Sequence, residues 1–98
     1  MQTYVIRRRS AWNSADELKE AAARSRQIGD EEMSDDVRWI RSYVVREADG
    51  TLGTHCIYQA TGPEAIREHA ARALMPADEI EEVVETVIVR PDPVEAQV

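Results

Sequence analysis

The sequence has no phenylalanine and only one cysteine, Cys56. A single cysteine excludes an intrachain disulfide. No apolar run is long enough to span a membrane, and the N-terminal residues lack the apolar stretch of a signal peptide. These absences predict a cytoplasmic protein, in a reducing compartment, without a membrane partner.

Basic residues are also few. Twelve Lys and Arg stand against 19 Asp and Glu, which gives a net charge of −7. Because an acidic protein repels phosphate backbones, nucleic acid is excluded as the main partner. Arg7, Arg8 and Arg9 form the one basic run, but they alternate along a predicted strand and do not share one face. We expect this run to form a solvated sheet edge.

The residues that are present suit one small domain. The chain has 98 residues and is 43% hydrophobic, which is enough for a modest globular core. We expect the domain to span residues 1–92. Prolines at 91 and 93 stop the last strand, so residues 93–98 are predicted to form a mobile C-terminal tail.

Residue patterns predict four strands and two helices. The strands are expected at residues 3–8, 37–47, 54–60 and 82–89, and the helices at residues 14–28 and 63–74. Ser14 and Glu17 form a capping box for the first helix, and Gly29 is its expected stop. The order predicts an α+β, ferredoxin-like βαββαβ domain, with a four-stranded antiparallel sheet and both helices on one face.

The second and fourth predicted strands are apolar on both faces. In the second, Trp39 and Tyr43 alternate with Ile40 and Val44, and residues 83–88 follow a similar pattern. Two helices cover only one face of such a sheet, so the other face would expose apolar side chains. We therefore expect a homodimer that pairs sheet to sheet.

Several segments together resemble a known family. They are Tyr4-Val5-Ile6, Trp39 with Ser42-Tyr43-Val44, Cys56-Ile57-Tyr58-Gln59-Ala60, Glu64 to Ala70, Pro76 to Ile80, and Glu82-Val83. The chain is similar over residues 4–92 to a bacterial family of small, otherwise uncharacterised domains named after a nickel-binding protein. The resemblance implies a ferredoxin-like fold, often dimeric, and a non-enzymatic domain that binds nickel or another divalent transition metal.

His69 is the foremost candidate for chemistry, because it lies on the inner, apolar stripe of the second predicted helix. It is expected to be buried, either as a core histidine bonded to a tyrosine or a carbonyl, or as a metal ligand or base. Cys56 is the second candidate metal ligand, since thiolate and imidazole suit nickel, zinc or copper. A lone buried cysteine also fits a small apolar core residue. A symmetric pair of His55 side chains across a dimer axis is expected to be able to bind a metal adventitiously.

Two other functions remain open. A cofactor-independent enzyme of the dimeric α+β barrel type would use His69 as its base and act on a small molecule in a pocket between sheet and helices. The pocket residues expected from the sequence are Tyr58, Tyr43, Trp39 and Met75. The other possibility is a purely structural interaction module.

Overall fold

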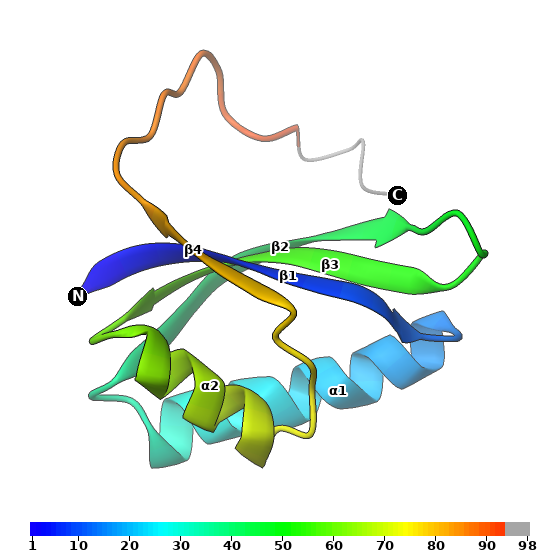
Figure 1. Ribbon diagram of the computed structural model, residues 1–98, viewed down its shortest axis with the longest axis horizontal. Coiled ribbons are helices and arrows are strands. Elements are labelled where there is room, and N and C mark those ends of the chain that lie inside the picture. The colour runs from blue at the N-terminus through cyan, green and yellow to red at the C-terminus, as the bar shows by residue number, and fades with distance from the viewer. Residues whose placement is uncertain (94–98) are drawn as a thin grey trace.

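The computed structural model describes residues 1–93 and contains one four-stranded antiparallel sheet with two helices on one of its faces (Figure 1). The strands are β1 (Gln2–Trp12), β2 (Val37–Arg46), β3 (Leu52–Ala60) and β4 (Glu79–Val83), and they lie in the order β2-β3-β1-β4. The helices are α1 (Ala15–Gln27) and α2 (Pro63–Arg72). This arrangement confirms the predicted ferredoxin-like α+β fold. No helix within residues 1–93 is long and apolar enough to cross a membrane.

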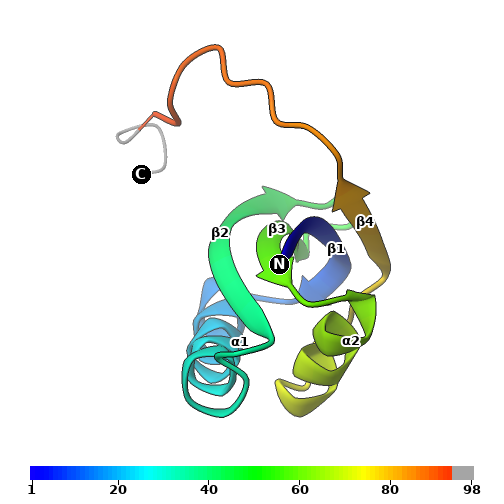
Figure 2. The same ribbon diagram turned by 90° about the vertical axis from the view of Figure 1, so that its left-hand side faces the viewer.

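Viewed end-on, α1 lies under the β2 side of the sheet and α2 lies under the β4 side (Figure 2). The core is the layer between these helices and the sheet. Its buried cluster consists of Tyr4, Ile6, Ile28, Met33, Val37, Cys56, Tyr58, Ala60, Ile66 and Ala73. Within residues 1–93 the opposite face of the sheet carries no helix, and the chain after β4 arches above it (Figures 1 and 2).

The start of α1 follows the predicted capping box only in part, because the Glu17 carboxylate bonds to the Asn13 amide and not to the Ser14 amide. The Ser14 hydroxyl accepts a hydrogen bond from the Glu17 amide at 3.3 Å, and the Glu17 carboxylate accepts one from the Asn13 amide at 3.0 Å. The first bond satisfies an amide donor that the first helical turn leaves free, and the second ties the residue before the cap to the helix. The predicted stop at Gly29 is wrong, because a π-helical turn, η1 (Ile28–Glu32), continues the helix past it. This turn brings Met33 into the core.

Strand β2 contains an irregularity that changes which side chains share a face. Trp39 pairs with Tyr58, but the next paired residue is Arg41, so Ile40 is the extra residue of a bulge. Trp39 therefore faces the helices. Tyr43, expected on the same face as Trp39, instead lies on the open face.

Strand β4 begins and ends earlier than residues 82–89. It pairs with β1 from Glu79 opposite Arg7 to Val83 opposite Thr3. Because β4 runs antiparallel to β1, it reaches the start of β1 at this point and has no further partner in the described chain. Val84 to Val89 consequently leave the sheet with their side chains exposed. Of the predicted mobile tail, residues 94–98 lie outside the described residues.

Candidate functional site: a buried polar cluster beside an apolar cavity

His69 lies on the inner face of α2 and is only 1% exposed, as its position on the stripe predicted. Its Nε2 donates a hydrogen bond to the Ser25 carbonyl oxygen of α1 at 2.9 Å. This bond assigns the proton to Nε2, so Nδ1 carries a lone pair, and Nδ1 has no partner in residues 1–93. Burial is the main cause that lowers the pKa of His69, and the charge of Arg8 lowers it further. His69 is therefore neutral at pH 7.

The buried polar cluster consists of Arg8, Ser25, Tyr58 and His69, and Tyr58 lies at its centre on β3. Its hydroxyl lies 2.9 Å from the Ser25 hydroxyl, and its ring centre is 5.4 Å from that of His69. The ring also stacks against Trp39, with 6.1 Å between centres and 8° between planes. Burial raises the pKa of Tyr58 to about 12, so the phenol stays protonated.

Arg8 is the member of the cluster that sequence reasoning missed. We expected it at a solvated edge, and this is wrong: Arg8 is fully buried, and its guanidinium lies 5.8 Å from the centre of the Tyr58 ring. All three of its side-chain nitrogens lack a hydrogen-bond partner in the described residues. The available signal was strand parity, because Arg8 shares the inner face of β1 with Tyr4 and Ile6.

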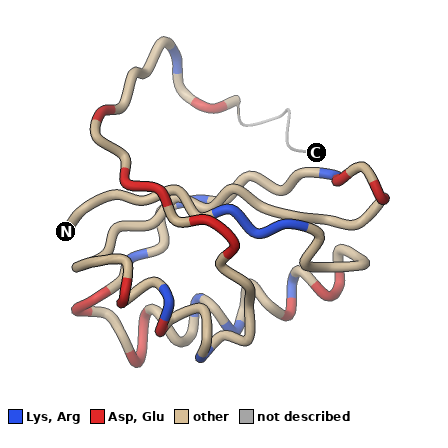
Figure 3. Tube along the Cα trace, in the orientation of Figure 1, with Lys and Arg blue, Asp and Glu red and all other residues tan. Residues whose placement is uncertain are grey.

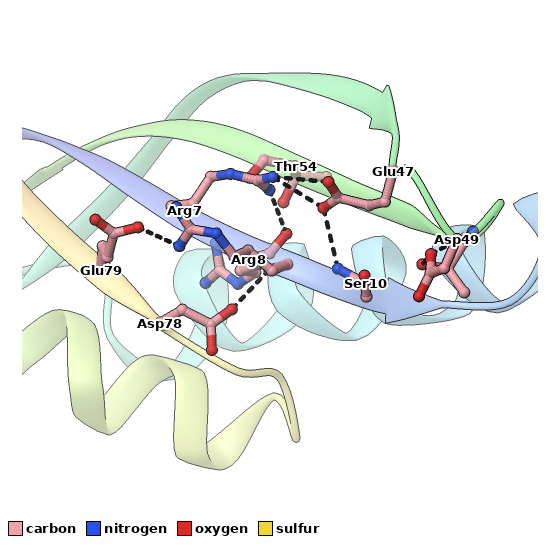
Figure 4. A network of polar contacts seen from close by, with 10 residues as sticks. Arg7, Arg8, Ser10, Glu47, Asp49, Thr54, Asp78 and Glu79 are labelled. Carbon is pink, nitrogen blue, oxygen red and sulfur yellow. Dashed lines mark hydrogen bonds and ion pairs between the residues drawn. The ribbon is translucent and has the colours of Figure 1, made fainter.

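The other two arginines of the run behave differently. Arg7 points to the open face, where its Nη2 donates to both carboxylate oxygens of Glu47 at 2.9 Å (Figure 4). Arg9 is exposed and pairs with Glu79 of β4. Figure 3 shows that the acidic residues of β4 run beside the basic stretch of β1. Of the three, Arg8 alone leaves the strand toward the helices (Figure 4), and it alone has no carboxylate partner within residues 1–93.

An apolar cavity of about 280 Å³ adjoins this cluster, between α1 and the inner face of β2 and β3. Among the residues that line it are Trp12, Trp39, Cys56, Tyr58, Met75 and Lys19. Three of the four expected pocket residues thus lie together. The fourth, Tyr43, lies on the open face, where its hydroxyl donates a hydrogen bond to Asp92 at 2.8 Å.

Cys56 is buried in the cavity wall, and its thiol donates to the Thr54 hydroxyl at 3.2 Å. No hydrogen bond links it to His69, which does not line the cavity. Residues 1–93 contain no group of three or more His, Cys, Asp and Glu side chains placed to hold a metal ion. One described chain therefore does not supply a complete ligand set around these two residues.

His55 lies on the other side of the sheet. It is half-buried on β3, opposite Arg7 of β1 and Tyr43 of β2. The charge of Arg7 is compensated there by Glu47. His55 is thus separated by the sheet from the buried cluster and faces the surface on which dimer pairing was predicted.

The element order, the sheet order and the one-sided helices define a ferredoxin-like α+β domain. A family model described as "Nickel responsive protein SCO4226-like" matches residues 4–83, so the chain belongs to this family, which confirms the resemblance found in the sequence. The crystal structure of SCO4226 from Streptomyces coelicolor A3(2) is similar, with a TM-score of 0.69 and 22% identity over 87% of this chain and 99% of that chain. A comparison with curated proteins found no match.

Proposed function

We propose that the chain works in the cytoplasm as a homodimer that binds a divalent transition metal such as nickel and catalyses no reaction. The observation that carries this proposal is membership of a nickel-responsive family over residues 4–83. A protein that responds directly to an ion must contact it, and imidazole and thiolate are the ligands this chain offers to nickel.

The dimer is supported by apolar side chains that stay exposed in the described part of a single chain. Val84, Val87, Ile88 and Val89 are 91%, 80%, 75% and 79% exposed, which is unusual for four apolar residues so close together. The chain from residue 86 to residue 92 arches over the open sheet face and leaves a hollow of about 680 Å³ beneath it. We propose that a second copy covers this surface by packing its own open sheet face against it. The contact would also cover the half-buried side chains of Val5, Ile57 and Val83.

Two ligand sets are proposed for the metal. The first is His69 with Cys56, which would use the free Nδ1 of His69 and needs further groups. The second is a pair of His55 side chains from two copies. The geometry favours the second set, since the uncompensated cation of Arg8 beside His69 repels a divalent ion, whereas His55 lies on the accessible face.

A second candidate function is a cofactor-independent reaction on a small apolar molecule. The cavity of about 280 Å³ favours it, because Tyr58 and Cys56 would offer polar groups to its contents. His69 would act as the base through Nδ1, which requires a rearrangement that brings this nitrogen to the cavity.

Elemental analysis of protein purified without an affinity tag tests the metal proposal, and sedimentation at micromolar concentration tests the dimer. Nickel calorimetry then separates the ligand sets. His55→Ala should abolish nickel binding, and the double variant Cys56→Ser with His69→Ala should retain it. The opposite pattern would support His69 and Cys56, and a metal-free wild type that takes up no nickel would refute both.

A further inference from the structure

The buried guanidinium of Arg8 has no counter-charge in the part of the chain that the structure describes. Arginine keeps its positive charge in proteins, and a buried charge without a partner is strongly unfavourable. The carboxylates that bond to this part of the protein serve its neighbours: Glu47 pairs with Arg7, Glu79 pairs with Arg9, and Asp78 accepts from the Arg9 amide. None of them bonds to Arg8.

The side chains around Arg8 do not supply a negative charge either. Tyr58, under the guanidinium, is a protonated phenol, and His69 is a neutral imidazole. The cluster therefore offers three guanidinium nitrogens as free donors and carries one net positive charge within the described residues. An anion would accept hydrogen bonds from these donors and also neutralise the positive charge.

The neighbouring cavity suits the apolar part of an anionic ligand, because its lining is mainly apolar and carries no acidic side chain. Thr54, which pairs with Arg8 across the strands, and Tyr58, which carries the guanidinium over its ring, both line the cavity. Arg8 therefore lies next to two residues of the cavity wall, although it does not line the cavity itself. Its other walls are mainly apolar. The only charged side chain among its described lining residues is Lys19, and none of them is acidic, although the chain carries 19 acids.

We propose that the cavity binds a small apolar monocarboxylate, such as a short fatty acid, whose carboxylate pairs with Arg8. The alkyl part occupies the space between Trp12 and Trp39, and the carboxylate meets the guanidinium at the wall formed by Thr54 and Tyr58, after these side chains shift. A guanidinium matches a carboxylate with two parallel hydrogen bonds, so this pairing also selects the charged end of the ligand. The site is independent of any metal on the open face.

Trp12 and Trp39 are the only tryptophans of the chain and both line the cavity, so intrinsic fluorescence reports on its contents. We would titrate the full chain, in EDTA, with octanoate and with octan-1-ol, which has the same alkyl length without the charge. Octanoate should change the fluorescence saturably and bind at least about tenfold more tightly than octanol, the order expected from a buried charge-assisted hydrogen bond.

Variants then assign the effect to Arg8. Arg8→Met should remove the preference for octanoate, whereas Arg9→Met, at the exposed arginine next to it, should preserve it. Ala22→Phe, which fills the cavity from α1, should abolish binding of both compounds and keeps the test valid if Arg8→Met does not fold. Equal affinity for octanoate and octanol, no binding of either, or an unchanged preference in Arg8→Met would overturn the proposal.

Discussion

The guanidinium of Arg8 lies 5.8 Å from the centre of the Tyr58 ring, in a place where solvent does not reach it. The ring face offers a cation–π contact, which replaces only part of the hydration that the charge loses. This pair makes the inside of the domain electrostatically unusual, and it leads to the first prediction.

Arg8→Met should stabilise the ligand-free protein by about 1–4 kcal/mol, because methionine fills similar space and removes an uncompensated buried cation. Chemical denaturation of both proteins in EDTA measures the difference. Arg9→Met serves as the control and should change stability little, since its charge is exposed. A marked loss of stability in Arg8→Met would mean that the chain itself compensates the charge.

His69→Leu should remove a pH dependence of stability. The folded state lowers the pKa of His69 through burial and the nearby Arg8, while Tyr58 and Ser25 facing the ring are neutral. As the pH falls below about 6.5, the unfolded chain therefore takes up a proton that the folded chain resists, and stability decreases. Denaturation between about pH 7.5 and about pH 5 should show a smaller decrease for His69→Leu. Equal decreases would show that the folded protein accommodates the proton.

Leu74→Gly should stabilise the protein by about 1 kcal/mol. Leu74 has a φ of 57° and ends α2 in a Schellman motif, in which the Met75 amide bonds to the Ala70 carbonyl at 2.9 Å. Leucine is strained in this conformation, and its side chain is 77% exposed, so little packing is lost. The matched control is Ala71→Gly inside the helix, which should destabilise by about 1 kcal/mol. Thermal melts of the two variants should move in opposite directions.

Glu47→Gln should destabilise the protein at neutral pH. The Glu47 carboxylate accepts from Arg7 and from the Ser10 amide, and these bonds lower its pKa, those with Arg7 most. A carboxylate with a lowered pKa contributes stability at neutral pH that is lost as the pH falls through its folded value. The difference from wild type should therefore shrink in acid. The exposed Glu20→Gln is the control, and a similar effect of both substitutions would exclude a specific role for the Arg7 pair.

Val87→Asp should convert the proposed dimer to monomer without unfolding it. Val87 is 80% exposed in the single chain, so a charge there costs the monomer little, but it would be buried between two copies. Sedimentation should give the mass of one chain for the variant and of two for the wild type. Leu74→Asp introduces the same charge at a similarly exposed residue at the end of α2 and should leave the dimer intact.

The order of the elements could be predicted from the sequence because it depends on local signals. Ser14 caps α1 whatever packs against it, and Pro63 suits the first turn of α2. The spacing of Ile66, His69 and Ala70 predicted the buried face of α2 for the same reason, since a helix has one repeating period. The burial of His69 and its bond to a backbone carbonyl followed from this.

Tertiary structure decided what depends on pairing between strands. The bulge at Ile40 is a matter of register with β3, and it moved Tyr43 away from Trp39 to the other face. The end of β4 at Val83 is set by where β1 begins, and this leaves Val84 to Val89 without a strand partner in the described chain. Strand parity predicts that Arg8 points toward the helices, but only the packing of the neighbouring elements makes it a buried charge, which has no hydrogen-bond partner within residues 1–93. Burial depends on all neighbouring elements together, so it could not be predicted from the strand alone.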